Sequence, residues 1–286
     1  MKKTLLMVGL VCLLHTSAHA WRAYNDLRWA PDDDGTNNIT LYSWTNNVTK
    51  GPAYETSGSL VNYETGEDLS ATLTVSSTDT GDYDYTNQGA NAVANTDADA
   101  VFGAAVGSKG NLSNGDITLT FAGLDTNLTY TIAVYGNRDA QTYAGVRYGK
   151  FTISNVTSFV NLSSSGTLTT TNVLDNDTTE YCTGYNTSNG YVARFSQIDP
   201  GSDGEIIITV QEGAQTSSGQ GKYANAVMIE TEEETGLILE ISQLLWVVFC
   251  LLGVARLRPL FAARTPDLRK WYRKVSRWRY DTRDST

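Results

Sequence analysis

The segment from residue 136 to residue 148 carries the side chains best suited to binding a sugar. Only nine basic residues lie between Trp21 and Val254, so two arginines within one short segment stand out. Tyrosine rings can stack on sugar rings, and polar side chains placed close together can bond neighbouring hydroxyl groups. The candidate ligand-binding residues are Asn137, Arg138, Asp139, Tyr143, Arg147 and Tyr148. The structural alternative is a surface hairpin with Arg–Asp ion pairs and β-favouring tyrosines.

A second set of candidates consists of aspartates grouped in short stretches, whose carboxylate oxygens could hold Ca²⁺. Asp97 and Asp99 form the best pair, because we expect them to precede an apolar strand and to share one face. The alternative is that these stretches are turns, in which Asp and Asn are common. One structural calcium ion is therefore a hypothesis, and the sequence indicates no other cofactor.

Histidine is absent from the mature chain that the sequence predicts. The two histidines, His15 and His19, lie in an N-terminal segment that we expect to be removed. Without histidine a chain cannot form a Ser-His-Asp or Cys-His site, and it lacks the commonest ligand of zinc, copper and iron. A carboxylate-based glycosidase stays open, because the 28 acidic residues between Trp21 and Val254 would allow a catalytic pair. The sequence favours a protein that is not an enzyme.

Residues 1–20 have the pattern of a secretory signal peptide. Two lysines near the start are followed by an apolar run of ten residues from Leu5 to Leu14. Ala18 and Ala20 then give the small-x-small pattern of a cleavage site. Cleavage there would make Trp21 the first mature residue. An N-terminal core helix is the alternative.

Residues 237–255 form a second hydrophobic segment, which we expect to cross a membrane once as a helix. Its clean apolar run, from Leu244 to Ala255, is shorter than the about 20 residues of a typical span. Arg256 and Arg258 follow at once, and a positive flank marks the cytoplasmic side of a span. A buried or interfacial helix is the alternative.

The two segments together predict a single-pass protein of the cell surface. Residues 21–230 would form an extracytoplasmic domain, residues 231–236 an acidic linker, and residues 256–286 a cytoplasmic tail. The charge follows this division, with a net −19 from Trp21 to Val254 and +7 from Ala255 to Thr286.

The tail has the pattern of a short basic amphipathic helix. Its apolar residues recur at helical spacing, while arginines and lysines occupy the other faces. Such a helix would lie on an anionic lipid surface, and because the tail is tethered to a membrane we expect no nucleic-acid partner. The apolar stripe consists of Leu268, Trp271, Tyr272, Val275 and Trp278.

Short runs of alternating apolar and polar residues dominate the region between the two ends. Period-2 alternation with Thr, Tyr and Val enrichment indicates strands, and clusters of Asp, Asn, Gly and Ser separate the runs. We expect about eight to ten strands in one all-β, antiparallel sandwich, with two smaller sandwiches as the alternative. The expected strands are 39–44, 71–76, 116–121, 130–135, 191–195, 205–210 and 224–229.

Residues 117–139, ITLTFAGLDTNLTYTIAVYGNRD, carry the clearest family resemblance. The Gly-Leu-x5-Tyr pattern between two strands resembles the corner of fibronectin type III domains, where a tyrosine hydroxyl bonds back to nearby backbone; here Tyr130 would do so. The wider pattern, with the later Asn225-Ala226, resembles the jelly-roll, galactose-binding-like domains of secreted bacterial proteins. This resemblance implies a jelly-roll-like sandwich.

The C-terminal region weakly resembles bacterial sorting tails of the PEP-CTERM type. Those tails combine a short motif, a hydrophobic helix and an arginine cluster, and residues 240–258 have similar parts without the Pro-Glu-Pro motif. The sequence thus favours a membrane-anchored, non-catalytic surface module that binds a polysaccharide or cell-surface glycan, or that is adhesive or structural. A carboxylate-based carbohydrate-active enzyme and a scaffold or signalling protein acting through its basic tail are the alternatives.

Overall fold

The computed structural model describes eight stretches of the chain. These are residues 20–27, 38–42, 54–78, 84–85, 89–103, 111–113, 115–217 and 221–232. The predicted signal peptide apart from Ala20, the predicted membrane helix and the predicted tail helix lie outside them. Within these stretches, no helix has the length and apolar character that crossing a bilayer requires.

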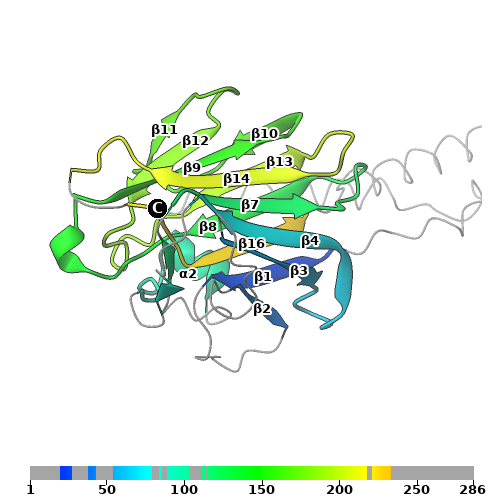
Figure 1. Ribbon diagram of the computed structural model, residues 1–286, viewed down its shortest axis with the longest axis horizontal. Helices are drawn as coiled ribbons and strands as arrows, with labels where there is room; N and C mark the ends of the chain where they lie inside the picture. Colours follow the sequence, from blue (N-terminus) through cyan, green and yellow to red (C-terminus); the bar gives the residue numbers. More distant parts are fainter. Residues whose placement is uncertain are drawn as a thin grey trace, which may run out of the picture. The chain divides into compact units, whose positions relative to one another are not determined.

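Two large sheets form the domain, which confirms the all-β prediction (Figure 1). The first has six strands in the order β10 (Ser158–Asn161), β13 (Ala193–Asp199), β8 (Tyr130–Tyr135), β16 (Ala226–Thr231), β1 (Arg22–Leu27) and β2 (Ile39–Tyr42). The second has seven, in the order β11 (Leu168–Thr170), β12 (Thr178–Cys182), β9 (Tyr148–Ser154), β14 (Ile206–Glu212), β7 (Ile117–Ala122), β4 (Asp68–Ser77) and β3 (Tyr54–Val61). The strands outnumber the eight to ten that the sequence predicted.

A small third sheet and two short helices complete the described elements. The sheet joins β15 (Tyr223–Ala224), β6 (Asn111–Ser113) and β5 (Asp84–Tyr85). The helices are α2 (Asp97–Phe102) and the single 3₁₀ turn η1 (Gln141–Tyr143). Pairing is antiparallel throughout the described strands except between β1 and β2, which run parallel. The expectation of a wholly antiparallel sandwich was wrong at this edge.

The main core lies between the two large sheets. Every second residue of β7 and β14 is buried, as the alternation of apolar and polar residues predicted. The buried positions of β7, from Ile117 to Phe121, pack in one cluster with those of β14 and with Ile132 and Val134 of β8. All seven predicted strands exist, and the observed boundaries differ by a few residues at most.

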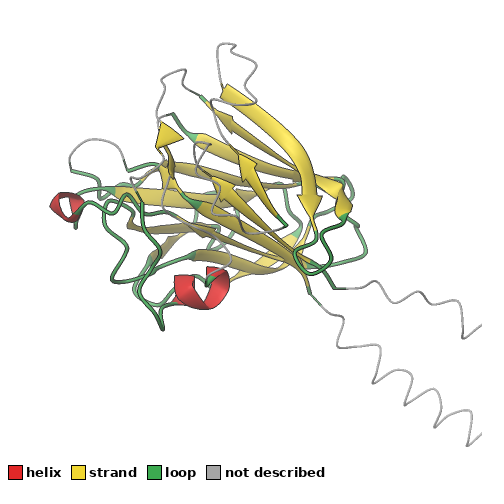
Figure 2. Cartoon of the chain, turned by 90° about the horizontal axis from the view of Figure 1, so that it is seen from below, coloured by secondary structure: helices red, strands yellow, loops and turns green. Residues whose placement is uncertain are grey.

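A second, smaller core covers the outer face of the six-stranded sheet. Strand β8 is buried at every position because α2, the larger red helix in Figure 2, packs against that face. Ala98 and Phe102 of α2 meet Tyr135 and Met228 there, within one cluster of buried side chains. The sheet is therefore covered on both sides at β8 and β16.

The two chain ends of the folded unit meet at one end of the sandwich. The backbone N–H of Thr231 donates to the carbonyl oxygen of Trp21 at 3.0 Å, and the N–H of Trp21 donates to Thr231 Oγ1 at 2.9 Å. Thr231 pairs with Tyr130 at the start of β8, whereas Ala226 pairs with Tyr135 about 17 Å away. We call the Trp21–Thr231 side the terminal end and the Tyr135 side the loop end.

The terminal end contains the predicted tyrosine corner. The hydroxyl of Tyr130 donates to the carbonyl oxygen of Asp125 at 3.0 Å, which confirms that expectation. Burial raises the pKa of Tyr130 to about 12. Strand β16 continues to Thr231, and the Glu232 carboxylate binds Thr131, Ser196 and Gln197, so the folded unit extends beyond the predicted boundary at residue 230.

Candidate ligand-binding site

The two arginines of the predicted sugar-binding loop are engaged with tyrosine rings. The Arg147 guanidinium lies 3.4 Å from the centre of the Tyr143 ring and donates to the Tyr223 hydroxyl at 2.5 Å. The Arg138 guanidinium lies 5.9 Å from the centre of the Tyr223 ring. Such cation–π contacts stabilise a loop that lacks regular structure. Arg147 thus lies on Tyr143, and Arg138 and Arg147 both contact Tyr223. None of Arg138, Tyr143 and Arg147 is among the lining residues of the three hollows found in the described part of the chain.

Asn137 does not face a ligand, because it is fully buried. Its Nδ2 donates to the carbonyl oxygen of Ala90 and to Thr187 Oγ1, and its Oδ1 accepts the N–H groups of Asp139 and Asn186. Both hydrogens and both lone pairs of the amide are occupied. The assignment of Asn137 to the binding residues was wrong in physical terms, since it is a structural amide.

Asn137 belongs to a group of three fully buried asparagines at the loop end, with Asn186 and Asn225. Asn225 Oδ1 accepts the N–H of Asn137 at 2.6 Å, and its Nδ2 donates to the Asn137 carbonyl at 2.9 Å. Asn186 donates to the carbonyls of Gly136 and Tyr191 and accepts the N–H of Tyr191. Backbone groups in these loops lack the strand-to-strand hydrogen bonds of a sheet, and the three amide side chains supply partners for them. The loops are therefore held in place by uncharged groups.

The structure places the remaining two predicted residues, Asp139 and Tyr148, in different surroundings. Asp139 is exposed and accepts a hydrogen bond from the Thr187 hydroxyl, which ties two loops together. Tyr148 is half-buried at the start of β9 and lines a groove of about 600 Å³ at the loop end. Of the six predicted residues, Tyr148 alone lines this groove.

Tyrosines from two segments, the start of β9 and the stretch 179–191, line the groove. Tyr148, Tyr185 and Tyr191 are half-exposed, and the buried Tyr181 forms part of the wall. Between the rings lie hydrogen-bonding side chains that carry no charge, together with one carboxylate. The polar lining consists of Thr167, Glu180, Cys182, Ser188, Asn189 and Gln215. A mixture of aromatic faces and convergent polar groups is the composition expected of a small-molecule or sugar site.

The tyrosines are held by packing and by the asparagine group. Tyr181 stacks on Phe151 at 4.9 Å between ring centres and meets Tyr191 edge to face at 6.2 Å. The Tyr181 hydroxyl accepts the N–H of Gly136, and complete burial raises the pKa of this tyrosine well above its ordinary value. Gly166 has a φ of +97°, and a Cβ there would lie 2.8 Å from the Tyr191 hydroxyl, so the absence of a side chain admits that ring.

Glu180 places a carboxylate in the groove wall. One of its oxygens accepts the N–H of Ala214 at 3.0 Å, and the other accepts the N–H of Gln215 at 2.9 Å. Burial raises the pKa of the neighbouring Tyr148, and the charges of Cys182 and Glu180 add to this effect. The groove therefore combines several tyrosines with one acidic side chain that is held in place by backbone N–H groups.

The predicted calcium pair lies in a helix instead of before a strand. Thr96 caps α2 by accepting the N–H of Asp99, and the Asp99 carboxylate accepts the N–H of Asn95 at 2.9 Å. This arrangement resembles a capping box, but the Asp99 carboxylate accepts from the residue before the cap instead of from the cap residue. Residues two apart point about 200° apart around a helix, so Asp97 and Asp99 do not share a face. The geometry on which the calcium hypothesis rested was wrong. Among the described residues, no group of three or more His, Cys, Asp or Glu side chains could hold a metal ion.

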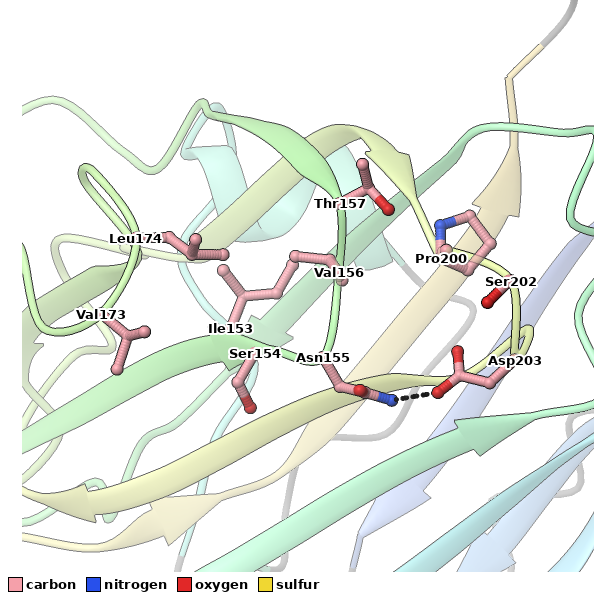
Figure 3. Close-up of a pocket in the computed structure, with 11 residues that line it drawn as sticks. Ile153, Ser154, Asn155, Val156, Thr157, Val173, Leu174, Pro200, Ser202 and Asp203 are labelled. Carbon is pink, nitrogen blue, oxygen red and sulfur yellow. Dashed lines mark hydrogen bonds between the residues drawn. The ribbon is translucent and has the colours of Figure 1, made fainter.

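A second hollow, of about 420 Å³, opens at the terminal end (Figure 3). Its sides are the apolar residues Val156, Leu174 and Pro200, and on its rim the Asn155 amide donates to the Asp203 carboxylate at 3.1 Å. No aromatic ring is present among its described lining residues. This hollow offers a ligand fewer recognition groups than the tyrosine groove does.

Sequence reasoning missed most of the groove because its residues come from several separate segments. The stretch TEYCTGYNTSNGY (179–191) supplies seven of the lining residues. Its density of tyrosine, glycine and small polar residues was a usable signal. The contribution of Gly166 and Gln215 depends on strand pairing that the sequence pattern does not specify. Comparison with protein-family models, curated proteins and solved structures found no match for this chain.

Proposed function

We propose that this protein is a membrane-anchored, extracytoplasmic carbohydrate-binding module with a jelly-roll-like sandwich. The tyrosine groove at the loop end carries the proposal. Three half-exposed tyrosines offer flat faces for sugar rings, while Ser188, Asn189 and Gln215 offer uncharged donors and acceptors for hydroxyl groups. Successive strands from β7 to β10 alternate between the two sheets, which supports the jelly-roll interpretation.

The position of the groove supports an anchored module. Trp21 and Thr231 lie together at the terminal end, and the chain continues beyond both. If residues 237–255 cross a membrane, a tether would leave from the terminal end and the groove would lie at the opposite end, towards the surroundings. The basic tail would then lie on the anionic inner lipid surface.

The groove supports binding better than hydrolysis. Glycosidases use two carboxylates on opposite sides of the scissile bond. Glu180 is the single carboxylate in the described lining of the groove, and both of its oxygens already accept backbone N–H groups. We therefore propose recognition of a glycan without its cleavage.

A glycan array tests the proposal with the full-length chain. We expect binding to at least one polysaccharide class, weakened about tenfold or more by Tyr191→Ala and by Tyr185→Ala. Tyr63→Ala is the matched control, because Tyr63 is also half-exposed but lies beside Arg22 at the terminal end. An array on which the wild-type chain binds no glycan would contradict the proposal.

Topology has a separate test in intact cells. Val173 is 79% exposed, so Val173→Cys combined with Cys182→Ser gives a single accessible thiol in the domain. We expect a membrane-impermeant maleimide to label it in intact cells. Labelling that requires cell lysis would place the domain on the inner side of the membrane.

A further inference from the structure

The charge of the tyrosine groove indicates which glycans it prefers, given that the proposed function is correct. Among the described residues that line the groove, Glu180 is the one that is formally charged at neutral pH. No lysine or arginine is among these lining residues. The nearby Arg147 is turned to Tyr143 and Tyr223. The described lining thus contains one carboxylate beside aromatic rings, and Lys150, which pairs with Glu180 between β9 and β12, lies outside that lining.

Glu180 stays able to interact with a cation. It is only 4% exposed, and each oxygen accepts one backbone N–H. A carboxylate has about four acceptor positions, so the two N–H groups leave further capacity. A charge that is mostly removed from water is also screened less by salt than an exposed charge is.

The tyrosines favour the same sign of ligand charge. The face of an aromatic ring is negative and attracts an ammonium group within about 6 Å of its centre. Tyr148, Tyr185 and Tyr191 are half-exposed and line the same groove as Glu180, which gives a cationic group ring faces and a carboxylate in one groove. The domain from Trp21 to Val254 has a net charge of −19, which would also attract a cationic polymer over longer distances.

We infer that the groove selects glycans that carry free amino groups, in the form of unacetylated hexosamine units. A hexosamine presents both an ammonium group and hydroxyl groups on one ring. The ammonium group would approach Glu180, and the ring would stack on a tyrosine. Anionic glycans would be repelled by the same carboxylate.

Three β-1,4-linked hexamers test this inference, because they differ mainly at carbon 2 of each ring. The glucosamine hexamer carries ammonium groups, the N-acetylglucosamine hexamer carries neutral acetamides, and the glucose hexamer carries hydroxyls. Calorimetric titration into the full-length chain at pH 6 should show at least about fivefold tighter binding of the glucosamine hexamer, which is the effect of about one close pair of opposite charges. This preference should shrink as salt is added.

Two substitutions assign the preference to the groove. Gln215→Lys adds a positive charge to the lining and leaves the backbone N–H that holds Glu180 in place. It should weaken binding of the glucosamine hexamer more than binding of the two neutral hexamers, and so abolish the preference for the glucosamine hexamer. Ser202→Lys makes the same change of charge at the terminal end, where Ser202 lines the other hollow, and should leave the preference intact.

The outcomes separate the inference from the proposed function. Equal binding of the three hexamers, or a preference that survives Gln215→Lys, would overturn the inference and leave carbohydrate binding standing. Binding of none of them, with neutral or acidic glycans bound on the array, would overturn the inference alone. Binding of none of them together with an array that shows no bound glycan would overturn both.

Discussion

The loop end and the terminal end of the sandwich are held together by different chemistry. Buried amides of Asn137, Asn186 and Asn225 fix the loops beside the groove, and the side chains of Asn137 and Asn186 bond to backbone groups and to the Thr187 hydroxyl. At the terminal end carboxylates do this work: Glu232 binds three donors, and Asp177 accepts the N–H groups of three successive residues. The amides of the asparagine group carry no charge, although the loop end also contains one buried carboxylate, Glu180, which accepts two backbone N–H groups.

The difference between the two ends predicts how the stability of each changes at low pH. Burial acts to raise the pKa of Asp177, but its backbone hydrogen bonds outweigh this effect and lower the net pKa. Burial also acts to raise the pKa of Glu232, and the hydrogen bonds that it accepts from Ser196, Gln197 and Thr131 outweigh that effect and lower the net pKa. A carboxylate whose pKa is lowered by folding stabilises the fold above its unfolded pKa of about 4, and this contribution is lost as pH falls through the folded value. The terminal end should therefore loosen in acid before the loop end does.

The largest expected effect falls at the loop end. Asn186→Ala should lower the free energy of unfolding by roughly 3 kcal/mol, because it leaves several buried backbone groups of Gly136 and Tyr191 without partners, at about 1–3 kcal/mol each. Urea unfolding at pH 7 and pH 4 measures it, and the loss should be similar at both. Asn172→Ala, at an exposed position, is the control. A loss confined to pH 7 would contradict the division between the ends.

Asp177→Asn should lower the free energy of unfolding by about 2 kcal/mol at pH 7, since charge-assisted bonds to Asn172, Val173 and Leu174 are weakened. The difference from wild type should shrink below about pH 4, where the carboxylate of the unfolded chain takes up a proton and the native one, whose pKa is lowered, still resists doing so. Asp175→Asn is the control, because Asp175 is exposed in the same turn. An effect that does not change with pH would show that the charge of Asp177 is unimportant.

Glu232→Gln should have a smaller effect, about 1 kcal/mol at neutral pH. The amide oxygen still accepts hydrogen bonds from Thr131 and Ser196 but without the charge. Amide hydrogen exchange should become faster in β13 and at the end of β16, and stay unchanged in residues 179–191 of the groove. Glu212→Gln, at an exposed position in β14, is the control. Faster exchange in the groove would contradict the independence of the two ends.

The smallest expected effect comes from Gly166→Ala, which is compared with Gly145→Ala. Both Gly166 and Gly145 have positive φ, at +97° and +71°, but only a Cβ at Gly166 meets the Tyr191 hydroxyl. Gly145→Ala should therefore cost only the backbone strain of about 1 kcal/mol. Gly166→Ala should in addition weaken glycan binding severalfold by displacing Tyr191. Equal binding by the two variants would mean that the position of this ring is not needed.

The sequence predicted the strands well because alternation of apolar and polar residues is a local property. Strands 117–122 and 130–135 were predicted within one residue, and Tyr130 was assigned its backbone bond. The parallel pairing of β1 with β2 was not predicted, since pairing partners are set by tertiary structure. Asp97 and Asp99 were misjudged because Thr96-x-x-Asp99 was not interpreted as a helix start.

The candidate site was less predictable for the same reason. The density of arginine and tyrosine in residues 137–148 identified the right end of the molecule, but Asn137 and Arg147 serve the loop itself. Tyr185, Tyr191 and Gln215 reach the groove through turns that no single-residue pattern encodes. Local composition thus pointed to the end of the molecule that contains the groove, and long-range pairing decided which side chains line it.

The pairing of Trp21 with Thr231 has a mechanical consequence. Strand β16 lies inside its sheet, hydrogen-bonded to β8 on one side and to β1 on the other. A pull between a ligand held at the loop end and the chain beyond Glu232 would run lengthwise along β16. The ladder bonds on both sides would then be loaded in shear and would have to break together. The domain is built to withstand tension along this axis, and peeling would begin more easily at an edge strand such as β10.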